Sequence, residues 1–141
     1  MRRIVLVVSS VALGVALMAP AMSARQGQDA AVIDKSMKAI GPAFGAARKA
    51  VEAGDMAAAK TAADTLSKSF VETEAFFKSH GKADGVEWAQ GAKKAADGIA
   101  AAATADAAKA PAGELGKLCA GCHTKYRDRA ADGTYSYKPG P

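Results

Sequence analysis

Apolar residues recur along this chain at alternating steps of four and three, in four segments separated by short breaks. In the first segment, one such stripe is formed by Ile33, Met37, Ile40, Phe44, Ala47 and Val51. This spacing keeps side chains on one face of an α-helix, at the a and d positions of a helix–helix seam. Three further segments, at about residues 56–79, 86–104 and 113–130, carry stripes with a similar period. The pattern therefore predicts four amphipathic helices.

Glycine and proline mark the breaks between these segments. Gly54 suits the left-handed position that ends a helix, and Asp55 suits the N-cap of the next helix. Residues 81–85 begin and end with glycine and predict a turn. Residues 106–113, which contain Pro111, form the longest predicted break.

These features predict an all-α fold. Four helices joined by short links favour an antiparallel four-helix bundle in up-down-up-down order. Much of the hydrophobic content is alanine, which favours closely packed helices over a sheet. No stretch alternates with the period of a strand, and the tail at residues 132–141, with Tyr135 and Tyr137, is predicted to be irregular. Residues 25–141 are then a single domain.

The first 24 residues have the order of an export signal. Two arginines follow Met1, an apolar run covers residues 4–18, and small residues suited to cleavage follow. A membrane anchor is the alternative, but a comfortable span needs roughly 20 apolar residues and this run is shorter. We therefore expect residues 1–24 to be a cleaved signal peptide, and the mature protein to be periplasmic with no membrane span.

The charge of the mature chain is only mildly basic. Removing the signal lowers the formal charge from +5 to +3, because Arg2 and Arg3 leave with it. Acidic and basic residues alternate along the helices. This mixed surface does not predict a nucleic-acid partner.

Both cysteines of the chain lie in the segment Cys119-Ala120-Gly121-Cys122-His123. This Cys-X-X-Cys-His pattern is typical of haem attachment: each thiol adds across one vinyl group of the porphyrin, and His123 binds the iron. On a helix, the three side chains lie within one turn of one another. Covalent attachment of haem in bacteria takes place outside the cytoplasmic membrane, which agrees with the expected export.

Three other interpretations of the cysteines compete with haem. A zinc site needs four ligands, or three and a water, and only His80 and scattered carboxylates remain to complete it. A thioredoxin-like redox pair lies beside a strand, which this sequence does not predict. A plain disulfide would not require His123 beside it. The predicted cofactor is one covalent haem c with its iron.

The place of the motif, on the last of four helices, resembles the class II cytochromes c, the cytochrome c′ group. The resemblance covers nearly the whole mature chain and is carried by residues 37–45 and 119–127. It implies that Met37 faces the haem on the side opposite His123. In the low-spin branch of the group, a methionine near this position is the sixth iron ligand. In cytochrome c′ proper, the equivalent side chain packs over a five-coordinate iron.

The chain departs from this group at one position. Many class II proteins have an arginine four residues before the distal position, where it pairs with a haem propionate, and Ile33 stands there in this chain. Lys35 and Lys38 are nearby as substitutes, and Arg127 is another candidate partner for a propionate.

We expect a periplasmic electron carrier, with His123 and Met37 as iron ligands and Cys119 and Cys122 as tethers. A thioether ligand favours reduced iron and raises the potential. The sequence contains no nucleophile or acid–base constellation, so no enzyme activity is predicted. The alternatives are a five-coordinate protein that binds NO or CO and, more distantly, a thiol oxidoreductase. Redox proteins are the expected partners, and the resemblance implies a homodimer as one assembly, because antiparallel dimers are common in class II proteins.

Overall fold

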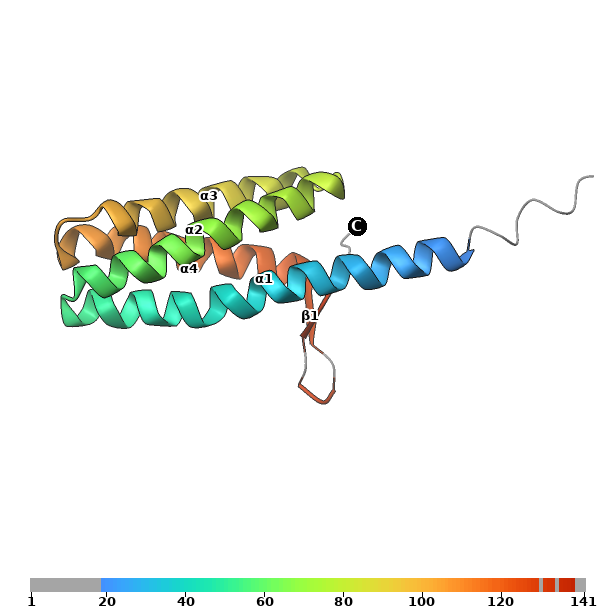
Figure 1. Ribbon diagram of the computed structural model, residues 1–141, viewed down its shortest axis with the longest axis horizontal. Helices are drawn as coiled ribbons and strands as arrows, with labels where there is room; N and C mark the ends of the chain where they lie inside the picture. The colour runs from blue at the N-terminus through green and yellow to red at the C-terminus, as the bar shows by residue number, and fades with distance from the viewer. Residues whose placement is uncertain (1–18, 130, 134, 139–141) are drawn as a thin grey trace, which may run out of the picture.

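The computed structural model describes residues 19–129, 131–133 and 135–138 of the chain. Four helices follow one another: α1 (Ala19–Ala53), α2 (Met56–Ser79), α3 (Ala83–Ala101) and α4 (Ala105–Tyr126). Figure 1 shows α2, α3 and α4 alongside the C-terminal half of α1, while the N-terminal part of α1 extends beyond them. Each helix packs against the next one in sequence. The predicted all-α fold is therefore confirmed, with four sequential packed helices that are consistent with an up-down bundle.

The predicted junction between the first two helices is confirmed. Gly54 has a φ of 72°, the left-handed conformation that glycine adopts without strain. The Asp55 carboxylate accepts a hydrogen bond from the backbone N–H of Ala58 at 2.9 Å. This N-cap satisfies one of the free N–H groups in the first turn, so α2 begins at Met56 as predicted.

The two other predicted breaks differ from the structure. α3 begins at Ala83, so the predicted turn is confined to the residues around Gly81, which has a φ of 65°. The predicted break at residues 106–113 is wrong, because α4 already begins at Ala105. The Thr104 hydroxyl caps this start by accepting a hydrogen bond from the N–H of Ala107 at 3.3 Å.

Pro111 lies inside α4 and packs against α3. Proline removes one backbone donor from a helix and usually ends it or bends it. Here its ring faces Gly98, where an added Cβ would lie only 3.1 Å from the Cβ of Pro111. Gly98 thus allows α3 and α4 to approach closely at this crossing.

The C-terminal tail forms a small antiparallel hairpin, so the prediction of an irregular tail is wrong for Tyr135 and Tyr137. Strand β1 (Arg127–Arg129) pairs with β2 (Tyr135–Tyr137), with Arg127 opposite Tyr137 and Arg129 opposite Tyr135. α4 ends before β1, rather than at about residue 130, because Arg127 takes extended backbone angles of −119° and 129°. Strands of three residues are too short to show a period in the sequence.

The core consists of two clusters. The larger one is built mostly from alanine, with Leu66, Phe70, Ile99 and Leu115 among its large buried side chains. The second, which we call the aromatic cluster, has a buried centre formed by Ile33, Phe76, Phe77 and Tyr126. The partly buried residues packed against this centre are Met37, Val86, Trp88, Cys122 and Tyr137. The predicted stripe of the first segment faces these two clusters, as expected.

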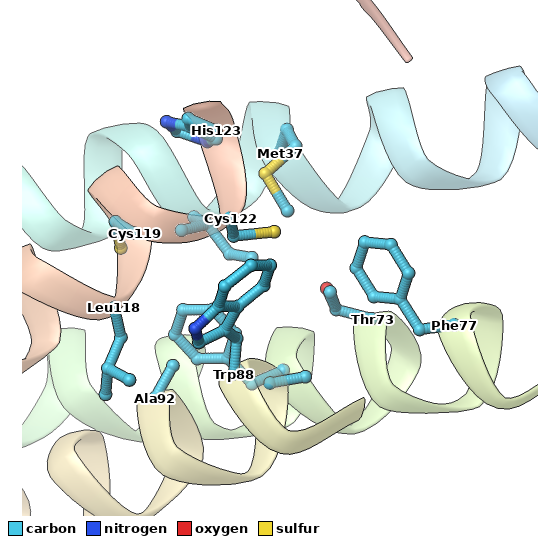
Figure 2. A pocket seen from close by; sticks show the side chains of 12 residues that line it. Met37, Thr73, Phe77, Trp88, Ala92, Leu118, Cys119, Cys122 and His123 are labelled. Atoms are coloured by element: carbon cyan, nitrogen blue, oxygen red, sulfur yellow. The ribbon is translucent and has the colours of Figure 1, made fainter. Parts of the chain in front are cut away.

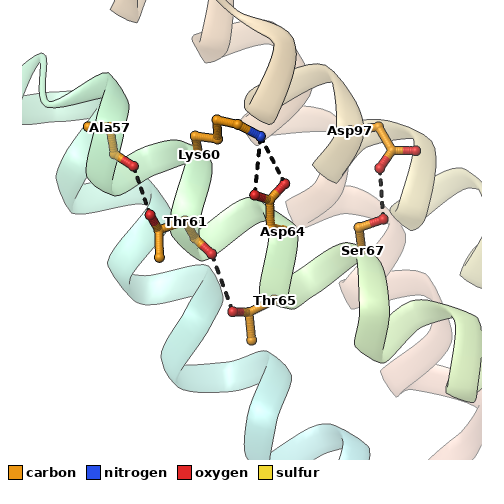
Figure 3. A network of polar contacts seen from close by, with 7 residues as sticks. All are labelled: Ala57, Lys60, Thr61, Asp64, Thr65, Ser67 and Asp97. Atoms are coloured by element: carbon orange, nitrogen blue, oxygen red, sulfur yellow. Dashed lines mark hydrogen bonds and ion pairs between the residues drawn. The ribbon is translucent and has the colours of Figure 1, made fainter.

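Polar contacts on the outer face of α2 are mostly local. Figure 3 shows Lys60 paired with Asp64 one turn further on at 3.1 Å, and the hydroxyls of Thr61 and Thr65 donating to carbonyls one turn earlier. The Ser67 hydroxyl reaches across to α3 and donates to the Asp97 carboxylate at 2.7 Å. Exposed pairs within one helix contribute only ~0.3–0.5 kcal/mol each. Apolar packing is therefore the main source of the bundle's stability.

Most of the expected signal peptide, residues 1–18, lies outside the described residues, and residues 19–24 are the first turns of α1. Its cleavage stays a prediction. Within the part of the chain that the structure describes, no helix is both long enough and apolar enough to cross a bilayer.

Candidate functional site

One small apolar cavity lies between the four helices, next to the aromatic cluster (Figure 2). Its volume is about 30 Å³. The lining residues are Met37 and Ile40 from α1; Phe70, Thr73 and Phe77 from α2; Trp88, Ala89 and Ala92 from α3; and Leu118, Cys119, Cys122 and His123 from α4. The four residues selected from the sequence, Met37, Cys119, Cys122 and His123, therefore lie around the same cavity.

Cys119 and Cys122 lie about one helical turn apart on α4, and both are partly buried free thiols. Burial raises the pKa of both thiols. The pKa of Cys122 rises to about 11, with the charges of Cys119 and Asp84 adding to the effect of burial. A protonated thiol is a poor nucleophile. In this folded arrangement, the thiol pair is not activated for redox exchange.

His123 follows Cys122 and lies at the edge of the cavity. Burial lowers the pKa of its imidazole, and the positive charge of Arg127 lowers it further. The ring is therefore neutral near pH 7, which is the form that binds a metal through a ring nitrogen. Figure 2 shows the ring directed away from Met37.

Met37 enters the cavity from α1 and lies near Cys122 of α4 (Figure 2). Its side chain is partly buried and packs against both core clusters. Methionine fills irregular apolar space well, and its thioether is also a soft metal ligand. The inward orientation is the one that the stripe of apolar residues in the first segment predicts.

Two glycines bring α3 and α4 close together beside the cysteines. A Cβ at Gly91 would lie 3.2 Å from the side chain of Leu118, which lines the cavity. A Cβ at Gly121, between the two cysteines, would touch the indole of Trp88 at 3.5 Å. Trp88 thus lies against the backbone of the Cys-X-X-Cys segment and reaches toward Cys122 in Figure 2.

Asp84 was not selected from the sequence, although it connects the ends of two helices beside the site. Its carboxylate accepts hydrogen bonds from the Lys125 ammonium and the Tyr126 hydroxyl, each at 2.6 Å. These two bonds lower the pKa of Asp84 to about 2. Burial and the Asp84 charge raise the pKa of Tyr126. The first turn of α3 is thereby tied to the last turn of α4, directly after His123.

The remaining residues considered from the sequence lie outside the cavity lining. His80 is the C-cap of α2, where its Nδ1 lies 2.7 Å from the Phe76 carbonyl oxygen. Met56 packs against the larger core cluster. The Arg127 guanidinium lies over the Tyr135 ring, 4.2 Å from its centroid. Lys38 is exposed and pairs with Asp34 at 2.6 Å.

The lining residues fit a covalently attached haem in their chemistry. They supply two thiols, a neutral imidazole and a thioether in apolar surroundings. Thr73 has the only hydroxyl group among these lining residues, and it donates a hydrogen bond to the Ser69 carbonyl at 2.9 Å. A cavity of about 30 Å³ is much smaller than a porphyrin. Lining side chains, the large ring of Trp88 among them, would therefore have to move aside for the flat ligand.

No family model, curated protein or solved structure matches this chain. Among the described residues, no group of three or more histidines, cysteines and carboxylates is arranged to hold a metal ion. The fold and the cavity define an all-α, four-helix protein whose Cys-X-X-Cys-His segment faces an apolar interior.

Proposed function

We propose that this chain is a periplasmic, monohaem c-type cytochrome that carries electrons. One observation supports the proposal above all: Cys119, Cys122 and His123 line the same apolar cavity as Met37, which comes from a helix far away in the sequence. The motif and the helical stripe are independent features of the sequence, and both lead to this cavity. The position of the motif on the last of four helices further supports a class II cytochrome c.

In this proposal, Cys119 and Cys122 would hold the haem through thioether bonds, and His123 and Met37 would bind its iron. Bound haem supplies a one-electron couple between Fe(II) and Fe(III). The chain itself provides the environment of the iron, which sets the reduction potential of this couple. The apolar lining excludes water and disfavours net charge, which stabilises the reduced iron, and the Met37 thioether stabilises it further. Electrons then pass to and from redox partner proteins.

The test is to export the full chain in a bacterium that attaches haem c and to purify it from the periplasm. We expect one haem per chain, by its pyridine haemochrome spectrum, that stays with the protein on acid–acetone extraction. The matched control replaces both tethers, Cys119→Ser with Cys122→Ser, and should lose its haem on extraction. A wild-type chain that carries no haem, or loses it on extraction, would overturn the proposal.

A five-coordinate protein that binds NO or CO is the second candidate. Its support is that Met37 packs against both core clusters, while the His123 ring is directed away from it. A methionine that only packs would leave the iron open to a small apolar gas on that side. The spin state of the iron separates the two candidates, because a bound thioether gives a low-spin spectrum.

A further inference from the structure

The C-terminal hairpin lies beside the candidate site, and the proposed function gives it no role. It follows α4 directly, and its second strand is tied back by the Lys138 N–H, which donates to the Tyr126 carbonyl at 3.0 Å. β2 also contacts α1. Figure 1 shows the hairpin leaving the bundle beside α1, near the end of α4. The residues at its base are therefore close to the helix ends that surround the aromatic cluster.

The two tyrosines of β2 have different surroundings. Tyr135 is 53% exposed, and its ring contacts are the guanidinium groups of Arg127 and Arg129 on the neighbouring strand. Tyr137 is partly buried and packs against the aromatic cluster. Its ring lies edge-on to Phe76, with centroids 5.0 Å apart, and stacks on Tyr126 at 6.2 Å.

Tyr137 stands directly behind a wall of the cavity. Its ring is 6.4 Å from Phe77, a lining residue, and Tyr126 contacts Phe77 at 4.8 Å and Trp88 at 6.1 Å. Gly85 of α3 also lies against Phe77, because even a Cβ there would lie 2.5 Å from the Cγ of the ring. Phe77 thus contacts both α3 and the two tyrosines. Tyr137 is the residue of β2 that packs against this group of rings, so its removal would take away the contact of the hairpin with them.

We propose that Tyr137 is a positioning residue of this site, which closes the end of the cavity by holding Phe77 and Tyr126 in place. The hairpin thereby keeps water away from Trp88 and, as far as the proposed function holds, from the haem. The aromatic ring of Tyr137 holds Phe77 and Tyr126 in place through its packing, and the hydroxyl group of Tyr137 is not required for this.

The experiment compares Tyr137→Ala with Tyr135→Ala, which removes the same group from the same strand but faces solvent. Trp88 is the only tryptophan of the chain and lines the cavity, so its fluorescence reports on access to the site. Acrylamide quenching is measured in the Cys119→Ser, Cys122→Ser background, which carries no covalent haem. We expect several-fold stronger quenching in Tyr137→Ala, unchanged quenching in Tyr135→Ala, and recovery in Tyr137→Phe.

The haem-loaded chain gives a second readout. The reduction potential should fall in Tyr137→Ala, because water at the haem edge stabilises the charged, oxidised iron, and should stay constant in Tyr135→Ala and Tyr137→Phe. Helix content by circular dichroism checks the fold, and Tyr137→Leu replaces Tyr137→Ala if that variant unfolds, with an increase in quenching still expected. Equal quenching in the Tyr137 and Tyr135 variants would overturn the proposal. A wild-type chain without haem would refute the proposed function alone, because the quenching comparison needs none.

Discussion

Phe77 is tightly packed beside the cavity. Its side chain is 1% exposed and contacts both Gly85 and the ring of Tyr126. A methyl group at Gly85 would lie 2.5 Å from the Cγ of Phe77, closer than side-chain atoms pack. The packing therefore leaves no room for a larger side chain at residue 85.

Gly85→Ala should accordingly lower the free energy of unfolding by about 1–3 kcal/mol, the usual cost of overpacking a core. Urea unfolding followed by circular dichroism measures this loss. Gly45→Ala is the matched control, because Gly45 is an exposed helical glycine with no atom within 4 Å of its added Cβ. That variant should gain up to ~1 kcal/mol from helix propensity. Equal stability of Gly85→Ala and the wild type would contradict the packing argument.

Met37→Leu separates ligation from packing, since leucine keeps a similar apolar volume and removes the thioether. We expect the loss of the far-red charge-transfer band, a change toward a high-spin spectrum and a lower reduction potential. Met56→Leu should leave all three unchanged, because Met56 packs against the larger core cluster, away from the cavity. An unchanged spectrum in Met37→Leu would mean that Met37 only packs, and would favour the gas-binding candidate.

The residues that could be predicted from the sequence are those in local patterns. Met37 and Ile40 share a stripe with a helical period, and the cysteines and His123 share a motif, so neighbouring residues alone select them. Asp84 could not be selected in this way. Its partners Lys125 and Tyr126 are 41 and 42 residues away, and their contact depends on how two helix ends meet.

Among the helices, the contact between the start of α3 and the end of α4 is sensitive to pH. Asp84 ionises at its usual 3.8 when unfolded, whereas its two hydrogen bonds lower the folded pKa to about 2. Ionisation of Asp84 therefore favours the folded chain. This contribution is complete above the unfolded value and is lost as the pH falls through the folded value.

Asp84→Asn should lower the melting temperature at neutral pH, because the Lys125 ammonium loses its partner and the Tyr126 hydroxyl loses a charged acceptor. Its melting temperature should also fall less than that of the wild type as the pH is lowered from about 4 to about 2. Asp64→Asn is the control, since Asp64 pairs only with Lys60 on the exposed face of α2 in Figure 3. If the melting temperature of Asp84→Asn falls as much as that of the wild type over this pH range, the Asp84 carboxylate is not the source of the pH dependence.

The ends of the helices could be predicted only where neighbouring residues in the sequence, such as capping residues, determine them. Gly54 and Asp55 are a strong end-and-start signal, and α2 begins where they predict. The start of α4 was missed because Pro111 indicates a break, whereas the Thr104 cap begins the helix before the proline. The hairpin depends on packing of Tyr137 against distant rings, which no local pattern contains.

For the molecule as a whole, four stripes and short links were enough to predict the class of fold. When the link between two successive helices is too short to cross the bundle, the simplest arrangement packs these helices side by side and antiparallel. The shape of the site could not be predicted in the same way. Its lining draws on all four helices, and the aromatic cluster behind it unites residues from α1, α2, α3, α4 and β2.

The unequal contacts between the helices also bear on how the chain matures. Contacts between successive helices are far more extensive than those between α1 and α4. A topology rich in local contacts folds quickly, and the contacts that join the two ends of a chain tend to form late. Docking of α4 against α1, which brings His123 and Met37 around one cavity, is then among the last steps. We expect both thiols to be more accessible before this step than after it, because they are partly buried in the folded chain.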